Sequence, residues 1–382
     1  MRIVYLSNYF NHHQKPLSDA FYAKTNGDYV FVETTGIPKE RKRLGYKELE
    51  APYVLNYMEN KELVDSLIMS ADVVIIGEAP VRMVVKRLRQ GLLTFHDNER
   101  RYKSPIKYLK WPIYTFKSLF LNQGYLLCAS AFAARDFRLS GMRTSKCYKW
   151  GYFTEVKDFD IDQLMMRKQS KVLDSQVPSI LWAARFIKLK HPELVVLLAD
   201  KLRSAGYKFQ INMIGTGPMA QDIEDMIVAK KLECHIKLLG SMSPEEVRTY
   251  METSDIFLAT SDQNEGWGAT VNESMSSACA VVASHSIGAV PYLINDGING
   301  MIFKSGNIDS LYQKVTCLID NPSCRNTIAT NAYCTMSHTW CASNASENFL
   351  ALCHSLLLES GNPIIDGPCS CAPIMDHNWK KL

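Results

Sequence analysis

The segment EGWGATVNE, residues 265–273, combines glycines, backbone amides and carboxylates in an order that could bind a phosphorylated ligand. It follows the apolar run DIFLATS and leads into the helical run NESMSSAC, so we predict a strand, a loop and a helix in succession. Gly268 lets the backbone turn tightly and approach a ligand closely. The amides of Gly268, Ala269 and Thr270 open the helix, and the positive end of a helix attracts phosphate. The pattern therefore predicts an anion site at this helix start.

Two carboxylates, Glu265 and Glu273, stand at the two ends of this segment. Neither gains from contact with a diphosphate, because charges of like sign repel. Each is therefore expected to accept hydrogen bonds from hydroxyl groups beside the diphosphate, on a ribose at one end and on a sugar at the other. The alternative is a solvated loop before a capped helix, and the spacing of two glutamates alone favours that alternative. The glycines and the predicted strand–loop–helix order favour a binding site.

Further polar residues follow two predicted strands in the first half of the chain. His96 comes directly after the run LLTF, and a histidine, whose ordinary pKa is about 6.5, can donate to an oxyanion or a hydroxyl at cellular pH. Asn11, His12 and His13 follow the first strand and could supply side-chain donors. For His96 the alternative is a loop histidine that caps a helix or contacts only solvent.

Strands and helices must position these residues, and the chain alternates short apolar runs with amphipathic ones through both halves. This alternation is typical of parallel α/β layers. The predicted strands are residues 2–6, 29–33, 73–76, 92–95, 125–129, 180–183, 209–214, 236–239, 256–259 and 281–283. Predicted helices include residues 61–70, 81–90 and 131–139, and Ser243 begins another helix with a capping box.

A polar, charged stretch at residues 156–177 interrupts the alternation, and we interpret it as a linker. It separates a first Rossmann-like domain, residues 1–155, from a second one, residues 178–336. A last helix over residues 337–358 could cross back to the first domain, and the proline- and glycine-rich residues 359–382 are expected to be poorly ordered. Doubly wound domains bind ligands at the carboxyl ends of their strands, so the cleft between the two domains is the expected site.

On these motifs the chain resembles glycosyltransferase family 4, whose members have the GT-B fold, with two Rossmann-like, doubly wound α/β domains facing a central cleft. The resemblance is clearest over residues 180–303. Glu265 and Glu273 match the family's pair of glutamates, and AVVASHSIGAVPYLINDGINGMIF resembles the strand and glycine turn that follow the pair. The resemblance implies a retaining glycosyltransferase in which Glu265 is a catalytic residue.

The same resemblance assigns roles to residues elsewhere in the chain. Arg185 and Lys190 match the Arg and Lys that hold the donor diphosphate in the family, and two cations after a strand end suit an anion. Gly215 and Gly217 match a GxGP turn near the nucleotide. His96 stands where family members place a residue near the transferring sugar and the acceptor, which implies a catalytic role for it.

Some features depart from the family pattern or allow another interpretation. Residues 11–13 lack the glycine-rich loop that often follows the first strand, and Tyr292 stands where many relatives carry a glutamate. Arg185 and Lys190 could be surface cations at a helix start, and GTGPMA could be a degenerate dinucleotide fingerprint. No ribose-binding carboxylate follows the next predicted strand, so the sequence disfavours a dehydrogenase.

The family implies transfer of a hexosyl or N-acetylhexosaminyl group from a nucleotide diphosphate sugar, with UDP favoured, to a glycan or lipid-linked acceptor. The stretch KWGYF at residues 149–153 resembles members that build bacterial surface polysaccharides. The chain lacks HxxxH and HExxH motifs and the family is metal-independent, so neither a metal nor another cofactor is expected. The alternatives are a nucleotide-sugar epimerase with the same fold and a non-enzymatic membrane-binding scaffold.

Charge is unevenly distributed along the 382 residues, whose net charge is +4. Residues 1–155 carry a net charge of +9 and the remainder −5. Residues 82–125 interleave basic with aromatic side chains and could lie on an anionic membrane surface that presents a lipid-linked acceptor. A buried amphipathic helix with a solvated basic face is the alternative. No recognised nucleic-acid-binding motif accompanies the charge, so nucleic acid is not an expected partner.

The first residues, MRIVYLSNYF, are typical of a strand rather than a signal peptide, and no apolar run is long enough to span a bilayer. The eleven cysteines form no pair of CxxC motifs. Both observations favour a cytoplasmic protein with reduced thiols, either free or peripheral on the cytoplasmic face of the membrane.

Overall fold

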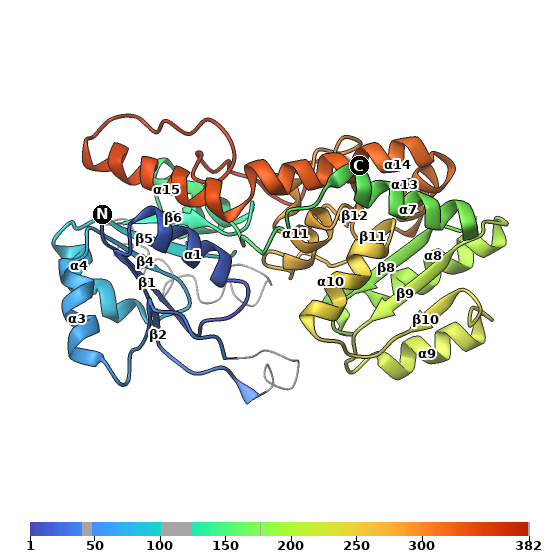
Figure 1. The fold of residues 1–382 in the computed structure, drawn as a ribbon, viewed down its shortest axis with the longest axis horizontal. Helices are drawn as coiled ribbons and strands as arrows, with labels where there is room; N and C mark the ends of the chain where they lie inside the picture. The colour runs from blue at the N-terminus through green and yellow to red at the C-terminus, as the bar shows by residue number, and fades with distance from the viewer. Residues whose placement is uncertain (40–47, 101–123, 176, 381–382) are drawn as a thin grey trace. The chain divides into compact units, whose positions relative to one another are not determined.

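A computed structural model shows two compact units, each built around one parallel sheet (Figure 1). The structure describes residues 1–39, 48–100, 124–175 and 177–380. The first unit contains Met1–Glu155 and Thr339–Trp379, and the second contains Val156–His338. None of the described helices combines the length and the apolar character that a bilayer-spanning segment needs.

The first unit contains a seven-stranded parallel sheet with the strand order β3-β2-β1-β4-β5-β6-β7. Its strands are β1 (Ile3–Ser7), β2 (Tyr29–Glu33), β3 (Val54–Asn56), β4 (Val73–Ile76), β5 (Thr94–Asn98), β6 (Tyr125–Cys128) and β7 (Cys147–Lys149). Its helices are α1 (Lys15–Lys24), α3 (Lys61–Ser70), α4 (Val85–Arg89), α6 (Ala133–Leu139) and α15 (Ala342–Leu357), with 3₁₀ turns η1 (Val81–Val84) and η3 (Thr144–Lys146). The winding of the chain reverses between β1 and β4, as in a doubly wound fold.

Side chains of this sheet alternate between its two faces, as the period of two along a strand requires. Leu6 and Val74 share a hydrophobic cluster with Ile68 of α3. Phe95 instead meets Phe349 of α15, with 4.8 Å between the ring centroids. Helix α15 also packs against α1, so this C-terminal helix completes the core of the first unit.

The second unit contains a six-stranded parallel sheet with the order β10-β9-β8-β11-β12-β13. Its strands are β8 (Ser179–Ala183), β9 (Gln210–Ile214), β10 (Ile236–Leu238), β11 (Ile256–Ala259), β12 (Ala280–Ser284) and β13 (Met301–Phe303). Its helices are α7 (Ile161–Ser175), α8 (Pro192–Ser204), α9 (Ala220–Ala229), α10 (Pro244–Thr253), α11 (Ala269–Ser276), α12 (Val290–Leu293), α13 (Ile308–Asp320) and α14 (Pro322–Cys334), with a 3₁₀ turn η4 (Lys188–Lys190) and a π turn η5 (Thr335–Thr339). The predicted capping box at Ser243 is confirmed at the start of α10.

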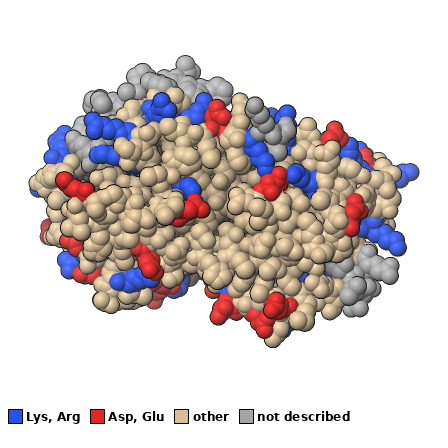
Figure 2. Space-filling model, turned by 90° about the horizontal axis from the view of Figure 1, so that it is seen from above, with Lys and Arg blue, Asp and Glu red and all other residues tan. Residues whose placement is uncertain are grey.

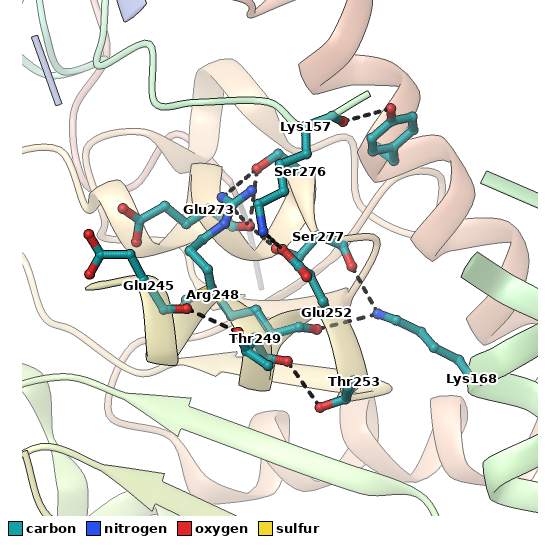
Figure 3. A network of polar contacts seen from close by, with 12 residues as sticks. Lys157, Lys168, Glu245, Arg248, Thr249, Glu252, Thr253, Glu273, Ser276 and Ser277 are labelled. Carbon is teal, nitrogen blue, oxygen red and sulfur yellow. Dashed lines mark hydrogen bonds and ion pairs between the residues drawn. The ribbon is translucent and has the colours of Figure 1, made fainter. Parts of the chain in front are cut away.

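Residues 156–177 form more than the linker that their polarity predicts, because they contain α7 and lie in the second unit. Leu164 and Met165 of α7 enter the hydrophobic core. Lys168, only 4% exposed, donates from Nζ to carbonyl oxygens at the ends of α10 and α11 (Figure 3). These acceptors are Met251 O at 3.4 Å, Ser254 O at 2.8 Å, Ser277 O at 2.9 Å and Ala278 O at 2.6 Å. A lysine thus has a structural role inside the unit, which a polar sequence pattern does not reveal.

The C-terminal tail differs from the poorly ordered segment that its composition predicts. The amide of Cys369 donates to Lys149 O at 2.8 Å, and the amide of Lys149 donates to Ser370 O at 2.7 Å. The amide of Ala372 donates to Cys147 O at 2.9 Å. Strand β7 is at the edge of the sheet, where unpaired backbone groups recruit another segment, and the tail satisfies them.

Strand β5 begins and ends two to three residues later than predicted, so His96 lies within the strand rather than after it. Strands β3, β7 and β13 were not predicted, because runs of three residues seldom show a clear alternating pattern. Of the basic segment at 82–125, residues 101–123 lie outside the described residues. On the face drawn in Figure 2, the described basic and acidic side chains occur in small groups among uncharged ones.

Replacing Lys168 by methionine is expected to lower the free energy of unfolding of the second unit by about 3 kcal/mol, because buried carbonyls lose their charged donor while the side-chain volume is kept. The measurement is urea denaturation at neutral pH. The control is Lys157→Met, which removes an ion pair with Glu252 at a lysine that is 41% exposed, and is expected to cost less than about 1 kcal/mol. Equal losses for the two variants would contradict the structural role of Lys168.

Candidate donor-binding site

The site in the second unit lies where the winding of its sheet reverses, between β8 and β11. In doubly wound folds, ligands bind at the carboxyl ends of the strands at this position, because neighbouring loops there diverge to opposite faces. The loop after β8 carries Arg185 and Lys190, and the loop after β11 carries Glu265. Residues far apart in the sequence are therefore brought to one edge of the sheet.

Lys190 and Glu265 form an ion pair between Nζ and Oε2. Their side chains are 15% and 16% exposed, so solvent screens the pair only partly. Arg185 is exposed at the same strand end. Lys190 thus lies beside one of the two predicted carboxylates, and Arg185 belongs to the same loop, although the ion pair itself was not predicted.

Backbone and side-chain hydrogen bonds tie these two loops together. Trp182 donates from Nε1 to Thr260 Oγ1 at 2.8 Å, and Thr260 Oγ1 donates to Lys190 O at 2.6 Å. The amide of Asp262 donates to Leu189 O at 2.9 Å. These contacts hold the cation-bearing loop against the loop that carries the glutamate.

The start of α11 has the form that the sequence predicts. Gly268 precedes the helix with φ = 95°, and a Cβ at this position would lie 2.7 Å from Cγ2 of Ile287, so glycine is required. No side chain caps the helix. Within the described residues, no acceptor takes the amides of Ala269 and Thr270. Free amides and the positive end of the helix dipole make this start able to bind an anion.

Glu273 lies about one turn inside α11 and is half-buried. Its backbone is fixed from α10, because Arg248 donates from Nη1 to Glu273 O at 3.1 Å and to Ser276 Oγ at 2.8 Å. Figure 3 shows the carboxylate of Glu273 pointing away from the guanidinium of Arg248. The carboxylate is therefore separate from the contacts that anchor its helix.

The turn after β9 needs both of its predicted glycines. A Cβ on Gly215 would lie 1.9 Å from Ala184 O, and one on Gly217 would lie 2.5 Å from Phe186 O. Any side chain would push this turn away from the loop that follows β8. The glycines thus place the turn against the segment that carries Arg185.

The predicted residues of the first unit occupy different environments. His96 is buried in β5, with 1% of its surface exposed. The Asn11 side chain accepts the amide of His13 at 2.9 Å, so Asn11 shapes the turn before α1. The rings of His12 and His13 lie 4.0 Å apart and are half-buried.

Two groups with functional potential were missed by the sequence analysis. Asp97 follows His96 on β5 and accepts a hydrogen bond from the hydroxyl of Tyr5. Burial raises the pKa of Asp97 to about 7, although the hydrogen bond from Tyr5 lowers it. His191, next to Lys190, contacts two carboxylates. The sequence gives no signal for His191, because its left-handed backbone and its contacts are visible only in the structure.

Comparisons with known proteins agree with this geometry. Residues 166–335 match the family model described as Glycosyl transferases group 1. An uncharacterized glycosyltransferase of Methanocaldococcus jannaschii is 31% identical over 36% of this chain and 38% of its own length. The alpha-D-kanosaminyltransferase of Streptomyces kanamyceticus is 26% identical over 47% of this chain and 46% of its own length. The chain thus spans less than half the length of these curated relatives.

Solved structures resemble the whole chain in fold. HepE of Anabaena, in complex with UDP, has a TM-score of 0.69 at 16% identity and covers 94% of this chain and 100% of its own. A glycosyltransferase from Rickettsia africae has a TM-score of 0.68 at 18% identity and covers 94% of this chain and 99% of its own. The chain therefore has the GT-B fold, and its residues 166–335 match the model of the group 1 glycosyl transferases.

Proposed function

We propose that the protein is a retaining glycosyltransferase that uses a nucleotide diphosphate sugar, with UDP favoured as the nucleotide. The observation that carries the proposal is the meeting of Lys190, Glu265 and the open start of α11 at the strand ends of the second unit. A diphosphate needs positive groups without a competing carboxylate at its oxygens, whereas a sugar needs hydroxyl acceptors. The arrangement offers both kinds of group.

During transfer, the bond between the anomeric carbon and the β-phosphate oxygen breaks, and its electrons remain on the nucleoside diphosphate. The acceptor hydroxyl oxygen bonds to the anomeric carbon, and its proton passes to the leaving diphosphate. Arg185, Lys190 and the amides of α11 would stabilise the charge that develops on the leaving diphosphate. Glu265 would accept a hydroxyl of the transferred sugar and Glu273 those of the ribose. These groups supply positive charge without a metal ion, so metal-independent transfer is part of the proposal.

In the first unit we propose His12 and His13, which are half-buried, as donors to the acceptor, whereas His96 lies buried within β5 and its catalytic role stays a prediction from the sequence. The acceptor class is a glycan or a lipid-linked glycan, and the proposed role is the biosynthesis of cell-surface polysaccharide. One relative, from Erwinia amylovora, carries the name amylovoran biosynthesis glycosyltransferase and is 28% identical over 35% of this chain, which supports that role. We propose a cytoplasmic protein that reaches such an acceptor at the membrane surface.

Removal of a cation at the diphosphate is expected to weaken UDP binding selectively. Arg185→Ala or Lys190→Ala should raise the Kd for UDP by roughly tenfold to a hundredfold, because each loses a charge-assisted hydrogen bond, and should leave uridine binding nearly unchanged. Isothermal titration calorimetry measures both ligands. The control is Lys188→Ala, an exposed lysine of the same turn. If UDP and uridine lose equal affinity, these cations do not contact the diphosphate.

The two glutamates are expected to differ in kinetics. Glu273→Gln should raise KM and the Kd for UDP together, because contacts to the ribose are uniform between ground and transition state. Glu265→Gln should lower kcat, since it loses its contact with the reacting sugar. It should not weaken UDP binding, because Lys190, released from its ion pair, remains available to the diphosphate. Steady-state rates with a donor sugar and UDP titrations distinguish the two. A Glu265→Gln variant that loses UDP affinity and keeps kcat would reverse the assigned orientation of the donor.

Metal removal is expected to leave the reaction intact. Excess EDTA should change the initial rate of donor consumption by less than about twofold, because fixed cations and helix amides balance the leaving charge. The measurement compares EDTA-treated enzyme with and without added magnesium or manganese. A strict requirement for either ion would overturn the metal-independent part of the proposal.

A further inference from the structure

His191 lies between the two loops of the candidate site and has an unusual backbone. It directly follows Lys190 and precedes Pro192, the first residue of α8. Its backbone is left-handed, with φ = 49° and ψ = 54°, a conformation that favours glycine and is uncommon for other side chains. The ring does not cap α8, because no side-chain cap bond is formed there. The histidine ring therefore has another use at a position where glycine would fit better.

Both ring nitrogens of His191 face carboxylates. Nδ1 lies 2.6 Å from Oε1 of Glu193, in the first turn of α8. Nε2 lies 3.4 Å from Oδ2 of Asp262, in the loop after β11. A carboxylate can only accept, so both contacts are satisfied together when both nitrogens carry hydrogen, that is, when the ring is an imidazolium. The side chain is 22% exposed, so few water molecules can compete with the two carboxylates for its N–H groups.

The two loops that the ring joins are the loops that carry the ion pair. Asp262 donates its amide to Leu189 O at 2.9 Å, beside Lys190, and Asp262 O accepts the amide of Glu265 at 3.1 Å. One backbone turn joins Asp262 to Glu265, so a displacement of Asp262 would also move Glu265. The contact of the His191 ring with the Asp262 carboxylate adds a side-chain link between the same two loops.

We propose that His191 is a positioning residue of the donor site, which as an imidazolium fastens the loop after β8 to the loop after β11 and so sets Lys190 and Glu265 for the diphosphate sugar. The identity of the ligand depends on the proposed function, whereas the fastening of the two loops does not. Affinity for a nucleoside diphosphate then depends on the protonation of a residue that need not touch the ligand.

The charged groups around the ring favour its protonated form. Glu193 faces it from α8 and Asp262 from the loop after β11, while Lys188 and Lys190 belong to the adjoining turn and Lys190 is paired with Glu265. The hydrogen bond with Glu193 raises the pKa of His191 above its ordinary value, against an opposing effect of burial, and Asp262 raises it further. Burial raises the pKa of Glu193, but the hydrogen bond from His191 lowers it, and the net effect is a pKa below the ordinary value.

The sign of the pH dependence follows from a raised pKa. A histidine with a raised folded pKa contributes its full stabilisation below its unfolded pKa of about 6.5 and loses it as pH rises through the folded pKa. The fastening of the two loops is therefore complete at about pH 6 and is lost at higher pH. The phosphate groups of UDP titrate too, so each measurement is expressed as a ratio between wild type and variant at the same pH.

The test uses the full chain and the variant His191→Gly, which suits the left-handed backbone and so is expected to fold. Hydrogen–deuterium exchange of the ligand-free proteins reports on the amides of Asp262 and Glu265. At pH 6 these amides are expected to exchange roughly tenfold faster in the variant, the equivalent of one charge-assisted hydrogen bond, and the ratio should approach one as His191 deprotonates. The control is His235→Gln, a histidine of the same unit that stacks on Phe209 and should change nothing.

UDP titration by calorimetry at the same pH values is the second measurement. The ratio of Kd between His191→Gly and wild type should be about ten at pH 6 and fall toward one at high pH. Asp262→Asn should reproduce this result, and the double variant should add little, because both changes remove one contact. Unchanged exchange, or equal UDP affinity of wild type and His191→Gly at pH 6, would overturn the proposal. Faster exchange in a protein that binds no UDP would support the fastening of the loops and refute the nucleotide donor instead.

Discussion

The parallel pairing of β8 with β11 is the constraint on which the candidate site depends. Ile180 lies opposite Ile256 and Leu181 opposite Phe257, so both strands end at the same edge of the sheet. Because the winding of the chain reverses between them, their loops turn toward opposite faces and leave that edge accessible to a ligand. Lys190 and Glu265 meet there although 75 positions separate them in the sequence.

Charge balance contributes to the stability of this edge. Lys190 and the N-terminus of α11 are both positive, and solvent screens charges at this edge only weakly, so the two would repel each other. The carboxylate of Glu265 supplies negative charge that offsets this repulsion. Helix α11 is held at its other end, where Lys168 and Arg248 bind carbonyls and cations interact favourably with the helix dipole (Figure 3). A bound diphosphate would take over the role of counter-charge, so the ion pair suits a site that alternates between two partners.

Much of the fold could be predicted from local patterns. The strands at residues 29–33, 73–76 and 256–259 have their predicted bounds, because a run of buried apolar residues between polar segments is visible in one dimension. Gly268 and the start of α11 were predicted for a similar reason, since a left-handed turn before a helix is a property of a few adjacent residues. The residue types at the candidate site were also predicted, by motif and by resemblance.

The sequence by itself determined the two α/β units and the chemical groups at their strand ends, because hydrophobic periodicity and glycine positions are local. Only the tertiary structure decided which groups pair: Lys190 with Glu265, Lys168 with four carbonyls, and the C-terminal tail with β7. It also decided that His191 contacts Asp262 across two loops. Such contacts join residues that are distant in the chain, and their energies depend on burial and geometry that no local pattern encodes.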